Sequence, residues 1–146
     1  MSTVGASGSG IHIEPNDAES VSVASNGEPV TVVILIAHGS RASASNDNHR
    51  DLAMALAERS GLDVRPAFLE LAEPSIPAAI DEAVADGATS LRVVPHFLGP
   101  GRHTTTDIPA AIDEATLRHP DVAFTVTAHL GSHPAIIDVV LDLIAP

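Results

Sequence analysis

The chain has 146 residues, of which 45% are apolar, so it is long enough to form one globular domain with its own core. Nineteen acidic and seven basic residues give a net charge of −12, which disfavours nucleic acid and anionic membranes as partners. The sequence holds no cysteine and no long apolar run, which excludes disulfides and thiolate metal sites and predicts no membrane span.

The first segment, residues 1–29, is rich in Ser, Gly, Asn and Glu. It lacks the basic start and the apolar run of a signal peptide, and it has no Arg, which argues against a transit peptide. We therefore predict a flexible N-terminal tail over 1–29, and a cytoplasmic protein.

From residue 30 onward, strand patterns alternate with helix patterns four times. Strands are predicted over 31–37, 63–69, 90–95 and 122–127, and helices over about 46–60, 76–86, 108–118 and 136–144. The β-branched run at 31–37 is typical of a strand buried on both faces, whereas Pro66 places the second strand at a sheet edge or a bulge.

This order predicts an α/β fold in which residues 30–146 form a single domain. Right-handed crossovers give three α/β/α layers around a mostly parallel four-stranded sheet. Because four strands make a small sheet, a helix face or a sheet edge can be left for a partner chain.

Histidines follow the predicted strands. The five that lie just past strand ends are His38, His96, His103, His129 and His133. Carboxyl ends of parallel strands share one edge, where ligands bind, and imidazole binds transition metals or moves protons near neutral pH. The pattern predicts a metal or proton-transfer site led by His38 and His103. A histidine hydrogen-bonded in a turn explains His38 equally well. Solvated roles are expected for the remaining three, His12, His49 and His119.

Other polar residues follow the same strand ends. Glu70 could bind a metal or accept a proton, or it could be a solvated acid. In the third loop, Gly99 and Gly101 would let the backbone approach a bulky ligand and lift His103, and Arg102 can pair with a carboxylate. Asp107 is expected to cap the next helix. The third loop lacks the Gly-Lys ending of a phosphate loop, which argues against such a loop. No Arg precedes His38, which argues against phosphohistidine chemistry.

Taken together, five segments resemble a known family. They are Ala37–Arg41, Glu70–Pro74, Phe97–His103, Asp107–Pro109 and Leu130–Pro134. They look like the short class II tetrapyrrole chelatases, the sirohydrochlorin ferrochelatases and cobaltochelatases of the CbiX/SirB type, and the resemblance covers almost everything after the tail. It implies a chelatase-like, flavodoxin-like half-unit that pairs as a homodimer, since the long members fuse two such units.

The resemblance also implies an activity: insertion of Fe²⁺ or Co²⁺ into sirohydrochlorin in siroheme or cobalamin biosynthesis, without ATP or an organic cofactor. His38 and His103 would be the metal-binding, catalytic residues, assisted by Glu70. A non-enzymatic metal or tetrapyrrole carrier using the same cleft is the alternative. The choice between iron and cobalt stays open at this point.

Four further positions are expected to contact the tetrapyrrole. Arg41 and Arg102 would offset the charge of its carboxylates, and Gly99 and Gly101 would give its ring room. His96 stands where many relatives carry an aromatic residue, and it is a candidate for an added ligand.

Overall fold

The computed structural model describes residues 27–146, so the predicted tail over 1–29 lies almost wholly outside it. The four strands are β1 (Thr31–Ala37), β2 (Asp63–Phe68), β3 (Ser90–Pro95) and β4 (Ala123–Val126). They form one sheet in the order β2-β1-β3-β4, and every neighbouring pair is parallel. The predicted parallel sheet is confirmed, and so is the edge position of the strand that contains Pro66.

Four helices alternate with the strands: α1 (Ser43–Ser60), α2 (Ile76–Ala85), α3 (Ile108–Arg118) and α4 (Ala135–Ile144). Two short turns precede the last two helices, a π-helical turn η1 (His103–Asp107) and a 3-10 turn η2 (Leu130–Ser132). The predicted start of α1 is three residues late, because the chain already turns at Ala42, whose carbonyl accepts from the Ser45 N–H. Strands β2 and β4 are one residue shorter than predicted at one or both ends.

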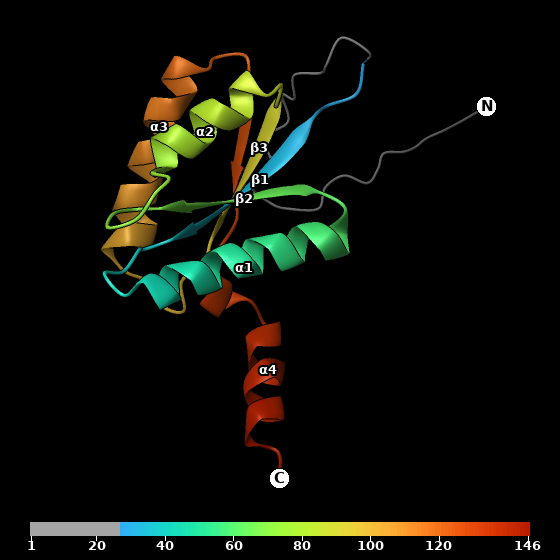
Figure 1. The fold of residues 1–146 in the computed structure, drawn as a ribbon, viewed down its shortest axis with the longest axis vertical. Coiled ribbons are helices and arrows are strands. Elements are labelled where there is room, and N and C mark those ends of the chain that lie inside the picture. Colours follow the sequence, from blue (N-terminus) through green and yellow to red (C-terminus); the bar gives the residue numbers. More distant parts are fainter. Residues whose placement is uncertain (1–26) are drawn as a thin grey trace, which may run out of the picture.

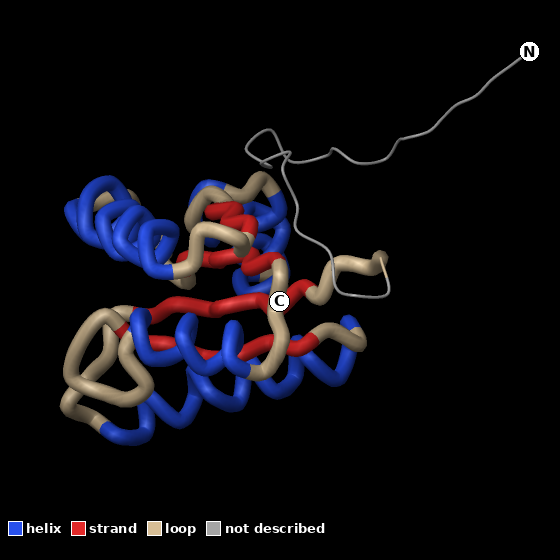
Figure 2. Tube along the Cα trace, turned by 90° about the horizontal axis from the view of Figure 1, so that it is seen from above, coloured by secondary structure: helices blue, strands red, loops and turns tan. Residues whose placement is uncertain are grey.

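Helices lie on both faces of the sheet, giving the three layers expected (Figures 1 and 2). Helices α2 and α3 cover one face and build the main core with Ile34, Ile80 and Leu91, all of them fully buried. Helix α1 covers the other face and packs mainly against β2. It buries only Asn46, His49 and Ala53, so this second interface is thin and partly polar.

The last helix departs from the expected layering. Its predicted position in the sequence is confirmed, but α4 projects away from the sheet (Figure 1). None of its residues is buried, although nearly all of them are apolar. In the described part of the chain, no helix is long and apolar enough to cross a membrane.

Candidate metal site at the carboxyl edge of the sheet

The loop after β1 is held close to the loop after β2. Gly39 has φ +97°, and a Cβ at this position would overlap the carbonyl oxygen of Glu70. Across the same approach, the Glu70 N–H donates to the His38 carbonyl oxygen at 3.0 Å. Glycine at position 39 therefore allows the contact that brings the side chains of His38 and Glu70 together.

Asn46 braces this loop from helix α1. Its Oδ1 accepts from the Ser40 N–H at 2.9 Å, and its Nδ2 donates to the Ser40 carbonyl at 2.7 Å. The Asn46 side chain satisfies both backbone groups of one residue while being 8% exposed. The position of the loop that carries His38 is thus fixed by a buried amide.

The His38 ring presents an electron pair to a carboxylate. Its Nδ1 lies 2.8 Å from the Gly39 carbonyl oxygen, and because a carbonyl only accepts, Nδ1 carries the proton. In the neutral ring, Nε2 then has the lone pair, and it lies 3.2 Å from Glu70 Oε2. Two acceptors that face each other at this distance repel unless a cation lies between or beside them. The pair is therefore suited to bind a proton or a divalent metal ion.

His103 is oriented in the same sense by a carboxylate of its own. It begins the π-helical turn η1, and its Nδ1 lies 2.8 Å from Asp107 Oδ2, one turn later. Nδ1 donates to the carboxylate, which leaves the lone pair on Nε2 and fixes the orientation of the ring. Carboxylate-oriented imidazoles of this kind are typical of metal ligands.

The two rings meet above the edge of the sheet. The ring centroids of His38 and His103 are 4.7 Å apart in an edge-to-face arrangement, and the ring centroid of Phe97 lies 6.2 Å from that of His103. Both histidine side chains are 40% exposed, so a ligand can reach them from solvent. Within residues 27–146, no group of three or more His, Asp or Glu side chains is arranged as a preformed metal site. The site is thus an open two-imidazole pair with Glu70 beside one ring.

A solvated role was expected for His49, but this residue of α1 is buried, with 4% of its surface exposed. Its Nε2 donates to the Leu35 carbonyl at 2.9 Å, so its Nδ1 carries the lone pair and accepts from His96 Nδ1 at 3.0 Å. The two rings are stacked with centroids 5.2 Å apart. This chain of hydrogen bonds leaves His96 with its lone pair on Nε2.

Burial lowers the pKa of both rings in this pair. For His49 the largest cause is loss of solvation, reinforced by the neighbouring His96 and opposed by the hydrogen bond to Leu35. For His96 the cause is again burial. A pKa below its usual value agrees with a neutral His49 that accepts from His96.

The remaining predicted site residues have looser surroundings. Arg41 and Arg102 are exposed, and neither makes an ion pair with another residue of the described segment. Gly99 and Gly101 face open space and have no positive φ, so their backbone does not need glycine. Asp107 does not cap α3, contrary to expectation, because its side chain binds His103 instead. His119, expected to be solvated, binds Asp81 at 2.7 Å, and His12 lies outside the described residues.

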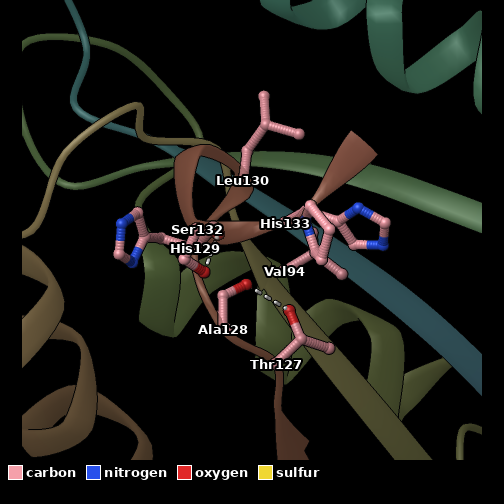
Figure 3. Close-up of a pocket in the computed structure, with 8 residues that line it drawn as sticks. Val94, Thr127, Ala128, His129, Leu130, Ser132 and His133 are labelled. Carbon is pink, nitrogen blue, oxygen red and sulfur yellow. Dashed lines mark hydrogen bonds between the residues drawn. The ribbon is translucent and has the colours of Figure 1, made fainter. Parts of the chain in front are cut away.

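The two histidines after β4 lie beside a pocket of about 370 Å³ at the start of α4 (Figure 3). His133 Nδ1 accepts from the Ala135 N–H, so this side chain lies at the start of α4. His129 lines the same pocket, but the two rings point away from each other (Figure 3). The pocket does not include the His38–His103 pair.

Three contributors to the site escaped the sequence reading. Asp107 lies four residues after His103, a spacing that places both on one face of a helical turn. Asn46 and His49 lie three residues apart in α1, a spacing that places both on one face of the helix. Two polar residues at this spacing are only a weak indication that the face is buried. Nothing in the sequence indicated that these two side chains would reach Ser40 and His96.

Comparison with known proteins points to one family. The family model CbiX matches residues 32–146. Sirohydrochlorin ferrochelatase, chloroplastic, from Arabidopsis thaliana is 41% identical over 113 residues, which are 77% of this chain and 50% of the relative. A sirohydrochlorin cobaltochelatase from Priestia megaterium is 35% identical over 107 residues, 73% of this chain and 35% of the relative.

Solved structures point to the same family. A putative cobalamin (vitamin B12) biosynthesis CbiX protein from Marinobacter aquaeolei VT8 superposes with a TM-score of 0.70 at 32% identity, covering 78% of this chain and 93% of the other. The sirohydrochlorin chelatase SirB from Bacillus subtilis subspecies spizizenii, in complex with cobalt, gives 0.71 at 26% identity, covering 77% and 48%. The chain therefore spans about half the length of several relatives, and nearly the whole of the Marinobacter protein.

Proposed function

The chain belongs to the CbiX family, and from this membership and the geometry of the site we propose that it inserts Fe²⁺ or Co²⁺ into sirohydrochlorin. The observation that carries the proposal is the pairing of His38 with His103, whose rings are 4.7 Å apart and whose Nε2 atoms both carry lone pairs. Neutral imidazoles bind Fe²⁺ and Co²⁺ well, yet two of them alone leave most of the coordination sphere free for handover.

The chemistry needs a place for the metal and a place for protons. Insertion replaces two pyrrolic protons by one divalent ion, so the macrocycle must lose both protons as the ion leaves the imidazoles. Glu70 Oε2, 3.2 Å from His38 Nε2, is the group placed to accept one of them. When the metal departs, His38 Nε2 regains its lone pair and can accept the other, and solvent can reach both groups because they are exposed.

The substrate carries several carboxylates, and the protein has a net charge of −12, so long-range repulsion must be offset locally. The two exposed cations in the loops that bear His38 and His103 are Arg41 and Arg102. In our proposal their guanidinium groups bind peripheral carboxylates of the tetrapyrrole. His96, with its lone pair on Nε2, stays a candidate for an added contact at the same edge, as do Gly99 and Gly101 in the third loop.

A homodimer is part of the proposal. This chain covers 48% of the cobalt-bound SirB chain, and the family resemblance implies that long members fuse two such units, so two copies of this chain would correspond to one long member. The exposed apolar surface of α4 is consistent with a partner chain. A cytoplasmic location is likewise a prediction.

Single histidine variants test the proposal. His38→Ala and His103→Ala should each lower the rate of metal insertion by about 100-fold or more, because each removes a metal ligand and a proton acceptor. The control is His119→Gln, since His119 follows the carboxyl end of α3 and binds Asp81 rather than the site. Insertion at the wild-type rate by either site variant, with a native circular dichroism spectrum, would contradict the assignment.

A further inference from the structure

Two exposed leucines lie in the loops on either side of the histidine pair. Leu71 follows β2 and is 51% exposed, and Leu98 follows β3 and is 73% exposed. In the sheet, β1 lies between β2 and β3, so the loop that carries His38 lies between the two leucine loops. The residues directly before the leucines are Glu70 and Phe97, whose side chains lie beside the histidine rings. Single exposed leucines are ordinary on a protein surface, but these two flank the candidate metal site.

The backbone of Leu71 has an unfavourable conformation. Its φ is +66°, and among the described residues it is the only one other than glycine with a positive φ. A β-carbon makes this left-handed region costly, and residues held in it are concentrated at active sites and ligand contacts. Asparagine or glycine adopts the same conformation more readily. The leucine side chain therefore occupies this position at a cost to the fold, which indicates a role in function.

Hydrogen bonds at both ends hold the loop that carries Leu71. At its start, the Leu69 N–H donates to the Ala37 carbonyl oxygen at 2.9 Å. At its end, Arg50 of α1 donates from Nη2 to the Glu73 carbonyl oxygen at 2.8 Å. The exposed leucine thus lies in a loop whose position is fixed by its neighbours on both sides.

The loop that carries Leu98 is held by the loop after β4. The Gly131 N–H donates to the Phe97 carbonyl oxygen at 2.9 Å, and a Cβ at position 131 would overlap the carbonyl group of Leu98. Glycine at this position therefore allows a close contact between the two backbones. The Phe97 side chain packs against the core, whereas the neighbouring Leu98 side chain is left open to solvent. The backbone of Leu98 is fixed while its side chain is uncovered.

The surroundings of the leucines favour a flat ligand over a protein partner. Strands β2 and β3 are two strand spacings apart, about 9–10 Å, so a ligand that contacts both leucines has to span a width of this order. A protein segment of that width would also cover the histidines between them and close the metal site to solvent. The exposed guanidinium groups of Arg41 and Arg102, in the loops after β1 and β3, suit a ligand with an acidic rim. A tetrapyrrole combines an apolar ring with such a rim.

We propose that Leu71 and Leu98 form a platform for the tetrapyrrole, contacting one face of its ring on either side of the ring centre. The ring centre then faces His38 and His103, from which the metal ion is transferred. The platform rests on the proposed insertion activity and names two residues that bind its substrate. Because apolar contact with the ring does not involve the metal ion, the platform should set the affinity for the tetrapyrrole and leave the affinity for the metal unchanged.

Binding of metal-free sirohydrochlorin tests the platform separately from catalysis. The dissociation constant is measured from the change in sirohydrochlorin absorbance on titration with protein in metal-free buffer. Leu71→Ala and Leu98→Ala should each raise this constant by about 5- to 10-fold, the effect of losing about half of a buried leucine contact. The matched controls are Leu62→Ala and Leu117→Ala, at 48% and 82% exposure, because Leu62 directly precedes β2 and Leu117 lies in the last turn of α3. Both controls should bind like the wild type.

Kinetics of cobalt insertion give a second readout. The two platform variants should raise KM for sirohydrochlorin and leave KM for Co²⁺ unchanged. Binding of sirohydrochlorin by both variants at the wild-type affinity would overturn the platform, while the insertion activity would stand. Leucine-dependent binding by a wild-type protein that inserts no metal would retain the platform and overturn the insertion activity. A wild-type protein that binds no sirohydrochlorin would overturn both.

Leu71→Asn separates a role in binding from a role in the fold. Asparagine tolerates the left-handed backbone, so the Tm of this variant should equal or exceed that of the wild type while its affinity for sirohydrochlorin falls. A lower Tm with unchanged affinity would show that the leucine serves the fold and would overturn its place in the platform. The masses of the Leu71 and Leu98 variants by light scattering should match the wild type. A changed mass would overturn the platform by showing that a second copy of the chain covers these leucines.

Discussion

Removing the carboxylate of Asp107 should weaken the site without touching the metal ligands. Asp107 Oδ2 lies 2.8 Å from His103 Nδ1 and fixes the tautomer that leaves the lone pair on Nε2. Loss of a carboxylate that orients a metal-binding histidine lowers metal affinity or activity by about 10- to 100-fold, equivalent to roughly 1.4–2.7 kcal/mol. We expect Asp107→Ala to lie within this range, nearer its lower end because the carboxylate is 35% exposed.

Asp107→Asn should fall between the wild type and Asp107→Ala. Its amide oxygen can still accept from His103 Nδ1, so the tautomer survives while the charge is lost. The assay is the initial rate of Co²⁺ insertion as a function of metal concentration, with thermal unfolding as a check of the fold. Asp113→Ala, an exposed acid of the helix that follows, is the matched control. The reasoning would be refuted if Asp107→Ala matched Asp113→Ala in both kcat and KM for the metal.

Three further substitutions probe the frame of the site. Gly39→Ala should lower the free energy of unfolding in urea by more than about 1–2 kcal/mol. The left-handed backbone alone costs that much, and the alanine Cβ also overlaps the Glu70 carbonyl oxygen. An unchanged midpoint of urea unfolding would contradict this. Asn46→Ala should cost about 1–3 kcal/mol by leaving both backbone groups of Ser40 unpaired, whereas full stability would mean that water replaces the amide. The pKa of His49 lies below its usual 6.5 in the folded state, so the unfolded chain binds more protons and stability falls as the pH drops below about 6.5. His49→Leu should therefore reduce the loss of stability on acidification, and parallel pH profiles for variant and wild type would rule this out.

Sequence patterns predicted the sheet and its helices because each buried strand and each amphipathic helix carries its own period. The continuous apolar run of β1 and the Pro66 of the edge strand are local signals, and both have the structural role expected. The placement of α4 could not be predicted in the same way. Its apolar pattern indicates a buried helix, but a pattern does not say whether the covering surface belongs to the same chain.

The same distinction between local signals and contacts across elements applies to the candidate site. The positions of His38, Glu70 and His103 follow from strand ends that share an edge, and the structure brings these three together. The supporting contacts depend on which side chains meet across elements. The contact of the buried His49 with His96 joins two elements far apart in the sequence, so no short spacing encodes it. The contact of Asp107 with His103 does have a short spacing of four residues, but the same position also suits a helix cap, and only the structure shows which role the side chain takes.

Turnover is the measurement that tests the central claim most directly. A catalytic amount of protein, mixed under anaerobic conditions with sirohydrochlorin and either Fe²⁺ or Co²⁺, should yield many equivalents of metallated product by absorbance, at a rate well above the uncatalysed reaction. The His38→Ala and His103→Ala proteins should show no such excess. Product formation by the wild type that stops at about one equivalent per chain would contradict the account and indicate a carrier that binds the metal or the tetrapyrrole without catalysis.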